Sequence, residues 1–364
     1  SSNESASKAR REGPLMTEME LLSDCPVHTS VPDKYVLPPE KRPSLLDDEP
    51  SSDVAIPVID LHGAAVSDDC RRQLVAAKII KASKEFGIFQ VVNHGVAEVV
   101  VQGFREAAAG FFAMPAEEKL PYLSDDQSKH FRVSSSTPYD RNGDRYWLDY
   151  LKINCHPVTD EHVREWPNKP ESFRSSLAEY SATVHELAQT LLRLIAEGLG
   201  LDDGFFAGDL SGGSTQMNVN YYPSCPDPSL TLGLLPHCDR HLLTVLSQGD
   251  VAGLQARHGG RWLLVRPVPG AFVVNLGHQM EIITNGLLAS VEHRAVTNTD
   301  AARLSVVTLI MPKMECRIGP APEMVNEATG PAKFREFEFS EFMKAYSAAA
   351  ASREDVLYYF RIHQ

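Results

Sequence analysis

The sequence is poor in cysteine, in positive charge and in long apolar runs. Its six cysteines are scattered over 364 residues without a CxxC pair, a pattern typical of reduced thiols that argues against a disulfide framework. No apolar run reaches the roughly 20 residues of a membrane span, and no leader of the charged, apolar and small-residue type opens the chain. A net charge of −13 disfavours nucleic acid and anionic membranes as partners. We therefore expect a globular cytoplasmic protein and, since no helix face demands a partner, a monomer.

Composition divides the chain into four parts. Residues 1–50 are rich in Ser, Glu, Lys and Pro and predict a disordered or extended tail. Its first part, 1–15, lacks an initiator Met and is interpreted as either an artificial addition or a native tail. Residues 51–213 carry mainly helical patterns, residues 214–320 carry strand patterns, and residues 321–364 return to a helical pattern.

Apolar periodicity predicts the main elements. Helical spacing predicts helices over 67–86, 97–112 and 178–201, and in the first of these Leu74, Ala77, Ile80 and Phe86 are expected roughly on one face. From about residue 214, β-rich runs follow one another between Gly, Pro, Asn and Asp. Close-set strands of this kind favour a barrel or jelly roll. The predicted fold class is α+β, a jelly-roll core with flanking helices that are mostly N-terminal.

One stretch of the strand-rich part, PHCDRH at 236–241, contains four possible metal ligands. Because side chains alternate along a strand, His237 and Asp239 share a face while Cys238 points to the other one. His241 has the parity of His237 but lies roughly 13 Å along the strand from it, too far to join the same metal ion easily. A third ligand should therefore come from a neighbouring strand.

Among the other histidines, His293 is the best third ligand, because it lies mid-strand in an alternating segment of the strand-rich part. Two histidines and one carboxylate occupy one face of an octahedron and leave three positions open, which suits non-haem Fe(II). Zinc, which prefers closed sites or sites with one open position, is the alternative metal.

Two further pairs of polar residues follow the strand period. Arg303 and Ser305 stand at i and i+2, so a guanidinium and a hydroxyl share a face. Such a pair binds a carboxylate well, although an exposed surface pair has the same pattern. Asn220 and Tyr222 share a face in the same way, one strand before the metal stretch, although a strand that runs into a Pro-rich turn has this pattern too.

In this order and spacing, the motifs resemble those of the plant Fe(II)- and 2-oxoglutarate-dependent dioxygenases. The resemblance rests on N-x-Y-P-x-C (220–225), H-x-D (237–239), the distal His293 and R-x-S (303–305), and it runs from about residue 55 to residue 350. It is strongest with the branch of the 2′-deoxymugineic-acid 2′-dioxygenases and hyoscyamine 6-dioxygenase, through stretches such as GDLSGG and ITNGLLASVEHRAVTN. The resemblance implies a distorted double-stranded β-helix, that is a jelly roll, with flanking helices.

The same resemblance implies an enzyme. Its Fe(II) ligands would be His237, Asp239 and His293, and its 2-oxoglutarate site would comprise Arg303, Ser305, Tyr222 and Asn220. The implied reaction uses O2, with ascorbate as reductant. It hydroxylates or desaturates a small plant metabolite or xenobiotic while 2-oxoglutarate is decarboxylated to succinate and CO2. The alternatives are an ascorbate-dependent or 2-oxoglutarate-independent iron oxidase of the same fold, a ligand-binding relative without turnover, and a structural zinc jelly roll.

The residues define the substrate less well. Candidates for the pocket wall, each of which also suits an ordinary core position, are Phe131, Tyr139, Trp147, Asp149, Tyr358 and Phe360. Related enzymes usually place a basic residue where this chain has Leu148, and this difference favours a more apolar substrate. Arg240 and His241, which follow the metal stretch, could meet a polar substrate or solvent, and solvent is the favoured expectation for both.

Overall fold

The computed structural model describes residues 20–25, 27–44, 54–64, 69–136, 143–349 and 353–363. Its α-helices are α1 (Asp69–Phe86), α2 (Glu98–Phe112), α3 (Ala116–Lys119), α4 (Asp160–Glu165), α5 (Phe173–Gly198), α6 (His278–Ile283), α7 (Phe339–Ala348) and α8 (Arg353–Tyr358). Its strands are β1 (Val58–Asp60), β2 (Ile88–Val92), β3 (Phe131–Ser135), β4 (Asp149–His156), β5 (Thr215–Tyr222), β6 (Leu234–His237), β7 (Leu243–Ser247), β8 (Leu254–His258), β9 (Arg261–Leu264), β10 (Phe272–Leu276), β11 (His293–Ala295), β12 (Arg303–Ile310), β13 (Arg317–Ile318) and β14 (Phe337–Glu338).

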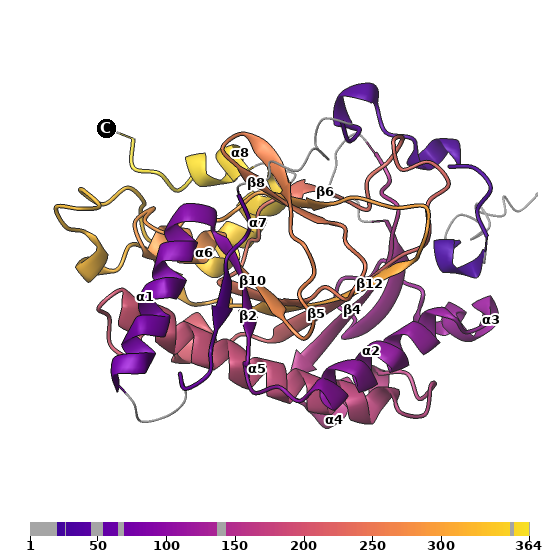
Figure 1. Cartoon of the computed structure of the whole chain (residues 1–364), viewed down its shortest axis with the longest axis horizontal. Coiled ribbons are helices and arrows are strands. Elements are labelled where there is room, and N and C mark those ends of the chain that lie inside the picture. The colour runs from indigo at the N-terminus through magenta and orange to yellow at the C-terminus, as the bar shows by residue number, and fades with distance from the viewer. Residues whose placement is uncertain are drawn as a thin grey trace, which may run out of the picture.

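The strands form a jelly roll with helices packed around it (Figure 1). The larger sheet has eight strands in the order β1-β2-β10-β7-β12-β5-β4-β3, and the smaller has four in the order β6-β11-β8-β9. In both sheets the pairs are antiparallel, except that β1 runs parallel to β2. The predicted α+β class with a jelly-roll core is confirmed.

The long helix α5 covers the outer face of the large sheet, and α1 and α2 pack beside it (Figure 1). Its apolar stripe, which includes Val184, Leu187 and Leu191, is buried as the helical spacing predicts. The helix ends at Gly198, and Gly200 follows in the left-handed conformation with φ 72°, which glycine adopts without a steric penalty. Residues of the large sheet whose side chains point toward α5 therefore lie in the main core. Residues that point to the opposite, inner face of this sheet remain available for a site.

The predicted face of α1 is wrong in part. Ile80 is buried as expected, but Leu74 is 59% exposed and Ala77 also lies on the exposed side. The buried face is completed by Val75 and Ile79 instead. Two adjacent faces of this helix carry apolar residues at helical spacing, so periodicity alone does not distinguish them. The face chosen in the structure is the one that packs against α5 and β2.

Strands β3 and β4 belong to the large sheet, although the sequence interpretation assigned 51–213 mainly to helices. On β4, Leu151 and Ile153 point into the main core, while Tyr150 and Lys152 point to the inner side. From Leu151 to His156 apolar and polar residues alternate strictly, so the ordinary strand signal was present in the sequence and was overlooked. The large sheet therefore begins before residue 214.

Residues 20–44, predicted as part of an extended tail, pack against the edge of the fold in the part that the structure describes. Leu22 and Tyr35 are buried, and the Tyr35 ring contacts the Trp147 ring edge-on at 5.3 Å between centroids. The carboxylate of Asp149 accepts the backbone N–H groups of Leu22 (3.0 Å) and Ser23 (2.7 Å). Burial raises the pKa of Asp149, and these hydrogen bonds act against the rise. Asp149 thus anchors the N-terminal segment.

None of the helices in the described parts of the chain combines the length and the apolarity needed to cross a bilayer.

Replacing Asp149 tests this anchor. Asp149→Ala leaves two backbone N–H groups without their acceptor, and we expect a loss of about 1–3 kcal/mol in the free energy of unfolding. We also expect faster proteolysis before residue 44. Urea denaturation and limited proteolysis measure both effects, with Asp300→Ala, at an exposed position, as the control. Unchanged stability and unchanged cleavage would show that the segment is held by its apolar contacts alone.

Candidate metal centre and active site

Three side chains converge where the smaller sheet meets the loop after β6. In the pairing of β6 with β11, His293 stands directly opposite His237, and Asp239 follows two residues after His237. The Nε2 atoms of both histidines lie 3.7 Å from Oδ1 of Asp239. The three ligand atoms all lie within 4.8 Å of one another, the one such cluster in the described part of the chain. The predicted set of ligands is therefore brought together.

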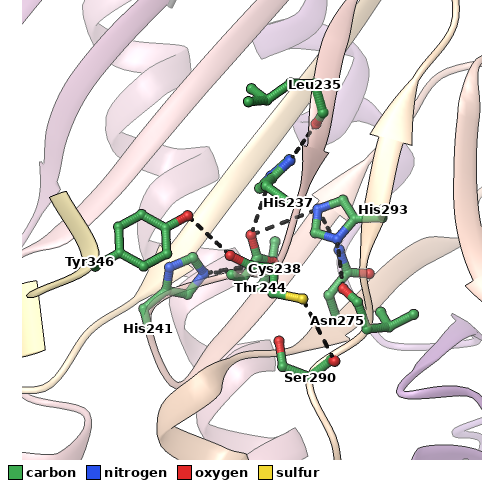
Figure 2. Close-up of polar contacts among 11 residues, drawn as sticks. Leu235, His237, Cys238, His241, Thr244, Asn275, Ser290, His293 and Tyr346 are labelled. Atoms are coloured by element: carbon green, nitrogen blue, oxygen red, sulfur yellow. Dashed lines mark hydrogen bonds and ion pairs between the residues drawn. The ribbon is translucent and has the colours of Figure 1, made fainter. Parts of the chain in front are cut away.

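Each histidine is held in the tautomer that a metal requires. Nδ1 of His237 lies 2.9 Å from the carbonyl oxygen of Leu235, and Nδ1 of His293 lies 3.1 Å from that of Val291 (Figure 2). A carbonyl oxygen only accepts hydrogen bonds, so both Nδ1 atoms must donate. The proton then resides on Nδ1, and the lone pair of Nε2 faces the shared point.

The two oxygens of the Asp239 carboxylate have different partners. Its Oδ2 accepts a 2.6 Å hydrogen bond from the hydroxyl of Thr244, while Oδ1 faces the two histidines. Nε2 of His241 lies 2.6 Å from the same hydroxyl (Figure 2). Because a hydroxyl has one proton and gives it to Asp239, Nε2 of His241 must be the donor in that contact. Thr244 and His241 therefore fix which carboxylate oxygen faces a metal.

The prediction that His241 faces solvent is wrong. Its side chain is buried behind Asp239, and its ring lies within 4.0 Å of Oδ2. The chain turns after Asp239 instead of continuing the strand, so the distance along an ideal strand does not apply. Arg240 is partly buried and borders the cavity described below.

Charges at the site favour a divalent cation. Burial and the neighbouring His293 lower the pKa of His237 to about 4, so its imidazole is neutral near pH 7. Burial alone would raise the pKa of Asp239, but His293, His241 and His237 together have the larger effect. The pKa of Asp239 is therefore lowered overall, and the group is ionised near pH 7. With both imidazoles in the neutral form that a metal requires, the three ligands carry a net charge of −1. This donor set, with one face open, fits Fe(II) better than a closed tetrahedral zinc site.

A second polar group lies on the inner face of the large sheet. In the pairing of β12 with β5, Arg303 is opposite Tyr222 and Ser305 is opposite Asn220. The Arg303 guanidinium lies over the Tyr222 ring at 5.3 Å, and its Nε donates to the carbonyl of Val251 at 3.1 Å. Burial raises the pKa of Tyr222, while Arg303 and hydrogen bonds from Ser305 act against the rise. The four residues predicted for 2-oxoglutarate therefore form one cluster.

Arg303 is a buried cation without an acidic partner among the described residues. It is 3% exposed, and burial lowers its pKa, with Arg105 acting in the same direction. A buried, uncompensated charge is costly unless a counter-ion arrives. This end of the site is thus prepared for an anion, and a planar guanidinium matches a carboxylate through two parallel hydrogen bonds.

One cavity connects the two clusters. It encloses about 870 Å³ between the atoms, counted out to the solvent at its mouth, and is lined by the three converging ligands and by Arg303 and Ser305. Its remaining wall includes several residues that the sequence interpretation did not select: Tyr150, Asn218, Arg240, Leu309 and Tyr346.

The predicted substrate wall is not the wall of this cavity. Phe131 and Phe360 are buried in the main core, and Trp147 packs with Tyr35 and Leu22. Asp149 holds the N-terminal segment, and Tyr358 is 61% exposed. Tyr139 lies outside the described residues. Phe131, Phe360 and Trp147 contribute to packing instead, because they lie on outer faces or in segments that turn away from the cavity.

Some of the missed residues had a signal in the sequence. Asn218 and Leu309 continue, at steps of two residues, the faces that carry Asn220 and Ser305. Tyr150 lies on the inner face of a strand that was not predicted, and it stands opposite Asn220. Tyr346 comes from α7, and its hydroxyl donates to the carbonyl of Cys238 at 3.1 Å (Figure 2). No local pattern in the sequence indicates that docking.

The hydroxyl of Thr244 provides a direct test of the metal centre. Thr244→Val keeps the shape of the side chain but frees Oδ2 of Asp239, and we expect a 10- to 100-fold weaker affinity for a divalent metal. Equilibrium dialysis with Mn(II) measures this affinity without turnover. Thr183→Val, on α5, where the hydroxyl bonds only to its own helix, is the matched control. Equal affinities of Thr244→Val and the unmodified protein would show that Thr244 does not orient the carboxylate.

Comparisons with known proteins agree with this geometry. Residues 213–312 match the 2OG-Fe(II) oxygenase superfamily, and residues 56–171 match the N-terminal region named for the non-haem dioxygenase in morphine synthesis.

The chain is 41% identical to 2′-deoxymugineic-acid 2′-dioxygenase of Hordeum vulgare, covering 90% of this chain and 93% of that protein. It is 39% identical to flavanone 3-dioxygenase 2 of Oryza sativa, covering 92% and 95%. The crystal structure of JOX2 in complex with 2OG, Fe and JA superposes with a TM-score of 0.80 at 31% identity, covering 93% of this chain and 96% of that one. The chain therefore belongs to the family of Fe(II)- and 2-oxoglutarate-dependent oxygenases.

Proposed function

We propose that this chain oxidises a small organic molecule at a C–H bond, with O2 and 2-oxoglutarate as co-substrates, at the cavity described above. His237, Asp239 and His293 hold Fe(II), and Arg303 binds the far carboxylate of 2-oxoglutarate. Ser305, Tyr222 and Asn220 complete that site. The default outcome is hydroxylation, coupled to release of succinate and CO2, and desaturation is the variant outcome.

One observation carries the proposal: an open three-ligand site and an uncompensated buried guanidinium line the same cavity. Three protein ligands leave room on the metal for further oxygen donors. Arg303 supplies the opposite charge at the far end for a dicarboxylic acid. A site that only stored a metal would have no need of the second group.

Iron, when bound, supplies the oxidising chemistry, and the residues of the chain supply binding and orientation. Nδ1 of each histidine is fixed by a carbonyl, and Oδ2 of Asp239 is fixed by Thr244, so the ligand atoms need little rearrangement on metal binding. Arg303 and Ser305 set the orientation of the co-substrate. The largely buried wall limits the access of water to the reacting groups.

The use of O2, ascorbate as reductant, the monomeric state and the cytoplasmic location stay predictions from the sequence. Among the alternatives, an oxidase that needs no 2-oxoglutarate would leave Arg303 without its anion, and the buried position of this guanidinium disfavours it. A structural zinc site is disfavoured by the open cavity beside the ligands. A relative that binds ligand without turnover differs only in its activity.

Succinate release tests the reaction. The purified protein, supplied with Fe(II), 2-oxoglutarate, ascorbate and O2, is expected to form succinate when the right pool of compounds is added: phytosiderophores, tropane alkaloids, flavonoids, phenolic acids, plant hormones or herbicide-like ketones. His293→Ala should abolish both iron binding and succinate formation, while the exposed His62→Ala should keep both. If the protein binds iron but forms no succinate, either with any pool of compounds or in their absence, the result would favour the oxidase or the non-catalytic relative.

Arg303 can be tested separately from the metal. Removing a buried partner of a charge costs on the order of 2–5 kcal/mol, so Arg303→Ala should raise the KM for 2-oxoglutarate at least about tenfold. Iron affinity should stay unchanged, because Arg303 is not a metal ligand. Arg261→Ala, at an exposed position on β9, is the control for a lost surface charge. A KM for 2-oxoglutarate unaffected by Arg303→Ala would assign its far carboxylate to another residue.

A further inference from the structure

The cavity has a second cationic end, on the side away from Arg303. Across the inner face of the large sheet, Val307, Asn218, Lys152 and Arg132 stand side by side on β12, β5, β4 and β3. Val307 and Asn218 line the cavity, as does Tyr150, which shares the inner face of β4 with Lys152. From the opposite side, Arg240 lines the cavity next to Asp239. Arg240 thus lines the cavity itself, while Lys152 stands beside Asn218, a residue of its wall.

These cations are close enough to repel one another. The pKa of Lys152 is lowered to about 8 by burial and by the charges of Arg132 and Arg240. Arg132 donates to the hydroxyl of Tyr150 at 3.3 Å, and both Arg132 and Lys152 donate to the side-chain oxygen of Gln127. The guanidinium of Arg240 lies over the Tyr346 ring at 5.8 Å, and its buried Nε has no hydrogen-bond partner among the residues that the structure describes.

No carboxylate of the described residues forms an ion pair with Arg132, Lys152 or Arg240. The charge of Arg132 helps to lower the pKa of Asp126, but the Asp126 carboxylate accepts its hydrogen bonds from the backbone N–H and the hydroxyl of Ser128. This absence is notable in a chain with 48 acidic and 35 basic side chains. Mutually repelling cations at the edge of a cavity destabilise the free protein and favour an anionic ligand.

Building on the proposed function, we propose that the substrate is a small organic acid whose carboxylate binds between Lys152 and Arg240. The rest of the molecule lies against Val307, Leu309 and the Tyr346 ring, with the oxidised carbon facing His237, Asp239 and His293. Lys152 lies two strands away from Ser305 across the sheet and two residues further along the strand. Strand geometry puts their Cα atoms roughly 12 Å apart. A small acid spans that interval from Lys152 toward the metal ligands.

This inference corrects the expectation of an apolar substrate drawn from Leu148. Leu148 does not itself line the cavity; it is buried in an apolar cluster that stands behind the wall and includes the lining residues Tyr150, Tyr222 and Ala295. The residue type at that position therefore says little about the ligand. The basic residues that face the cavity come from β3, β4 and the loop after β6.

Binding to the Mn(II) and 2-oxoglutarate form of the protein, which does not turn over, tests the proposal. The probes are aliphatic and aromatic monocarboxylic acids, each paired with its methyl ester, and calorimetry measures the dissociation constants. We expect acids to bind at least tenfold more tightly than their esters. Lys152→Met and Arg240→Met should each weaken acid binding at least tenfold with 2-oxoglutarate affinity unchanged. Lys152→Arg should retain it, and the exposed Lys78→Met should have no effect.

Several outcomes would overturn the inference: esters that bind as well as acids, acid affinity untouched by Lys152→Met, or no acid bound at about 1 mM. The proposed function would survive any of these, because it rests on succinate formation and on 2-oxoglutarate binding. If Mn(II) and 2-oxoglutarate do not bind, the proposed function fails and this inference fails with it.

A measurement without any ligand gives a second test. Because Lys152 is repelled by its neighbours, Lys152→Met should raise the thermal midpoint of the free protein, and Lys78→Met should leave it unchanged. A fall in the midpoint for Lys152→Met would make Lys152 a structural partner of Gln127, which contradicts the proposal.

Discussion

The pairing of β6 with β11 is the constraint on which the site depends, because it alone sets His293 opposite His237. A slip of one residue would turn either histidine to the other face of the sheet and separate the ligands. The turn that carries Asp239 is fixed from outside by the start of α6, where the N–H of His278 donates to the carbonyl of Asp239. Gly277 makes this approach possible, since a Cβ there would collide with the backbone of His241. Two strands and one close backbone contact thus position three ligand atoms.

The large sheet provides the rest of the cavity from a single face. Its outer residues, such as Val219, Val306 and Leu151, pack under α5 in the main core. Its inner residues line the cavity with polar, aromatic and aliphatic side chains. The burial of the outer face stabilises the fold, so the inner face is free to carry groups that are costly to bury, such as the Arg303 guanidinium. Stability and chemistry are separated by the alternation of side chains along the same strands.

The sequence was most informative where a residue type and a period coincide. His237 with Asp239 and Arg303 with Ser305 are pairs at i and i+2, and the structure places each pair as that spacing predicts. It was least informative where tertiary contacts decide. His241 is buried because the chain turns after Asp239, and Tyr346 reaches the site because α7 packs there. Trp147 resembled a pocket residue by its type, but it packs against the N-terminal segment instead.

The distribution of charge gives the cavity a direction. On the inner face of β12, Val307 lies level with Lys152 across β5 and β4, and it is four residues from Arg303, or roughly 13 Å at about 3.3 Å per residue. One cationic group lies at the Arg303 end, and Lys152 with Arg240 lies toward the other, with the net negative charge of the metal ligands between them. 2-Oxoglutarate, bound at Arg303, and the substrate acid, bound at Lys152 and Arg240, would therefore lie in opposite orientations. The other end of each molecule would then lie near the metal ligands. The same electrostatics that bind each acid therefore also orient it, and because the two cationic ends are far apart, neither acid has to compete for the binding groups of the other.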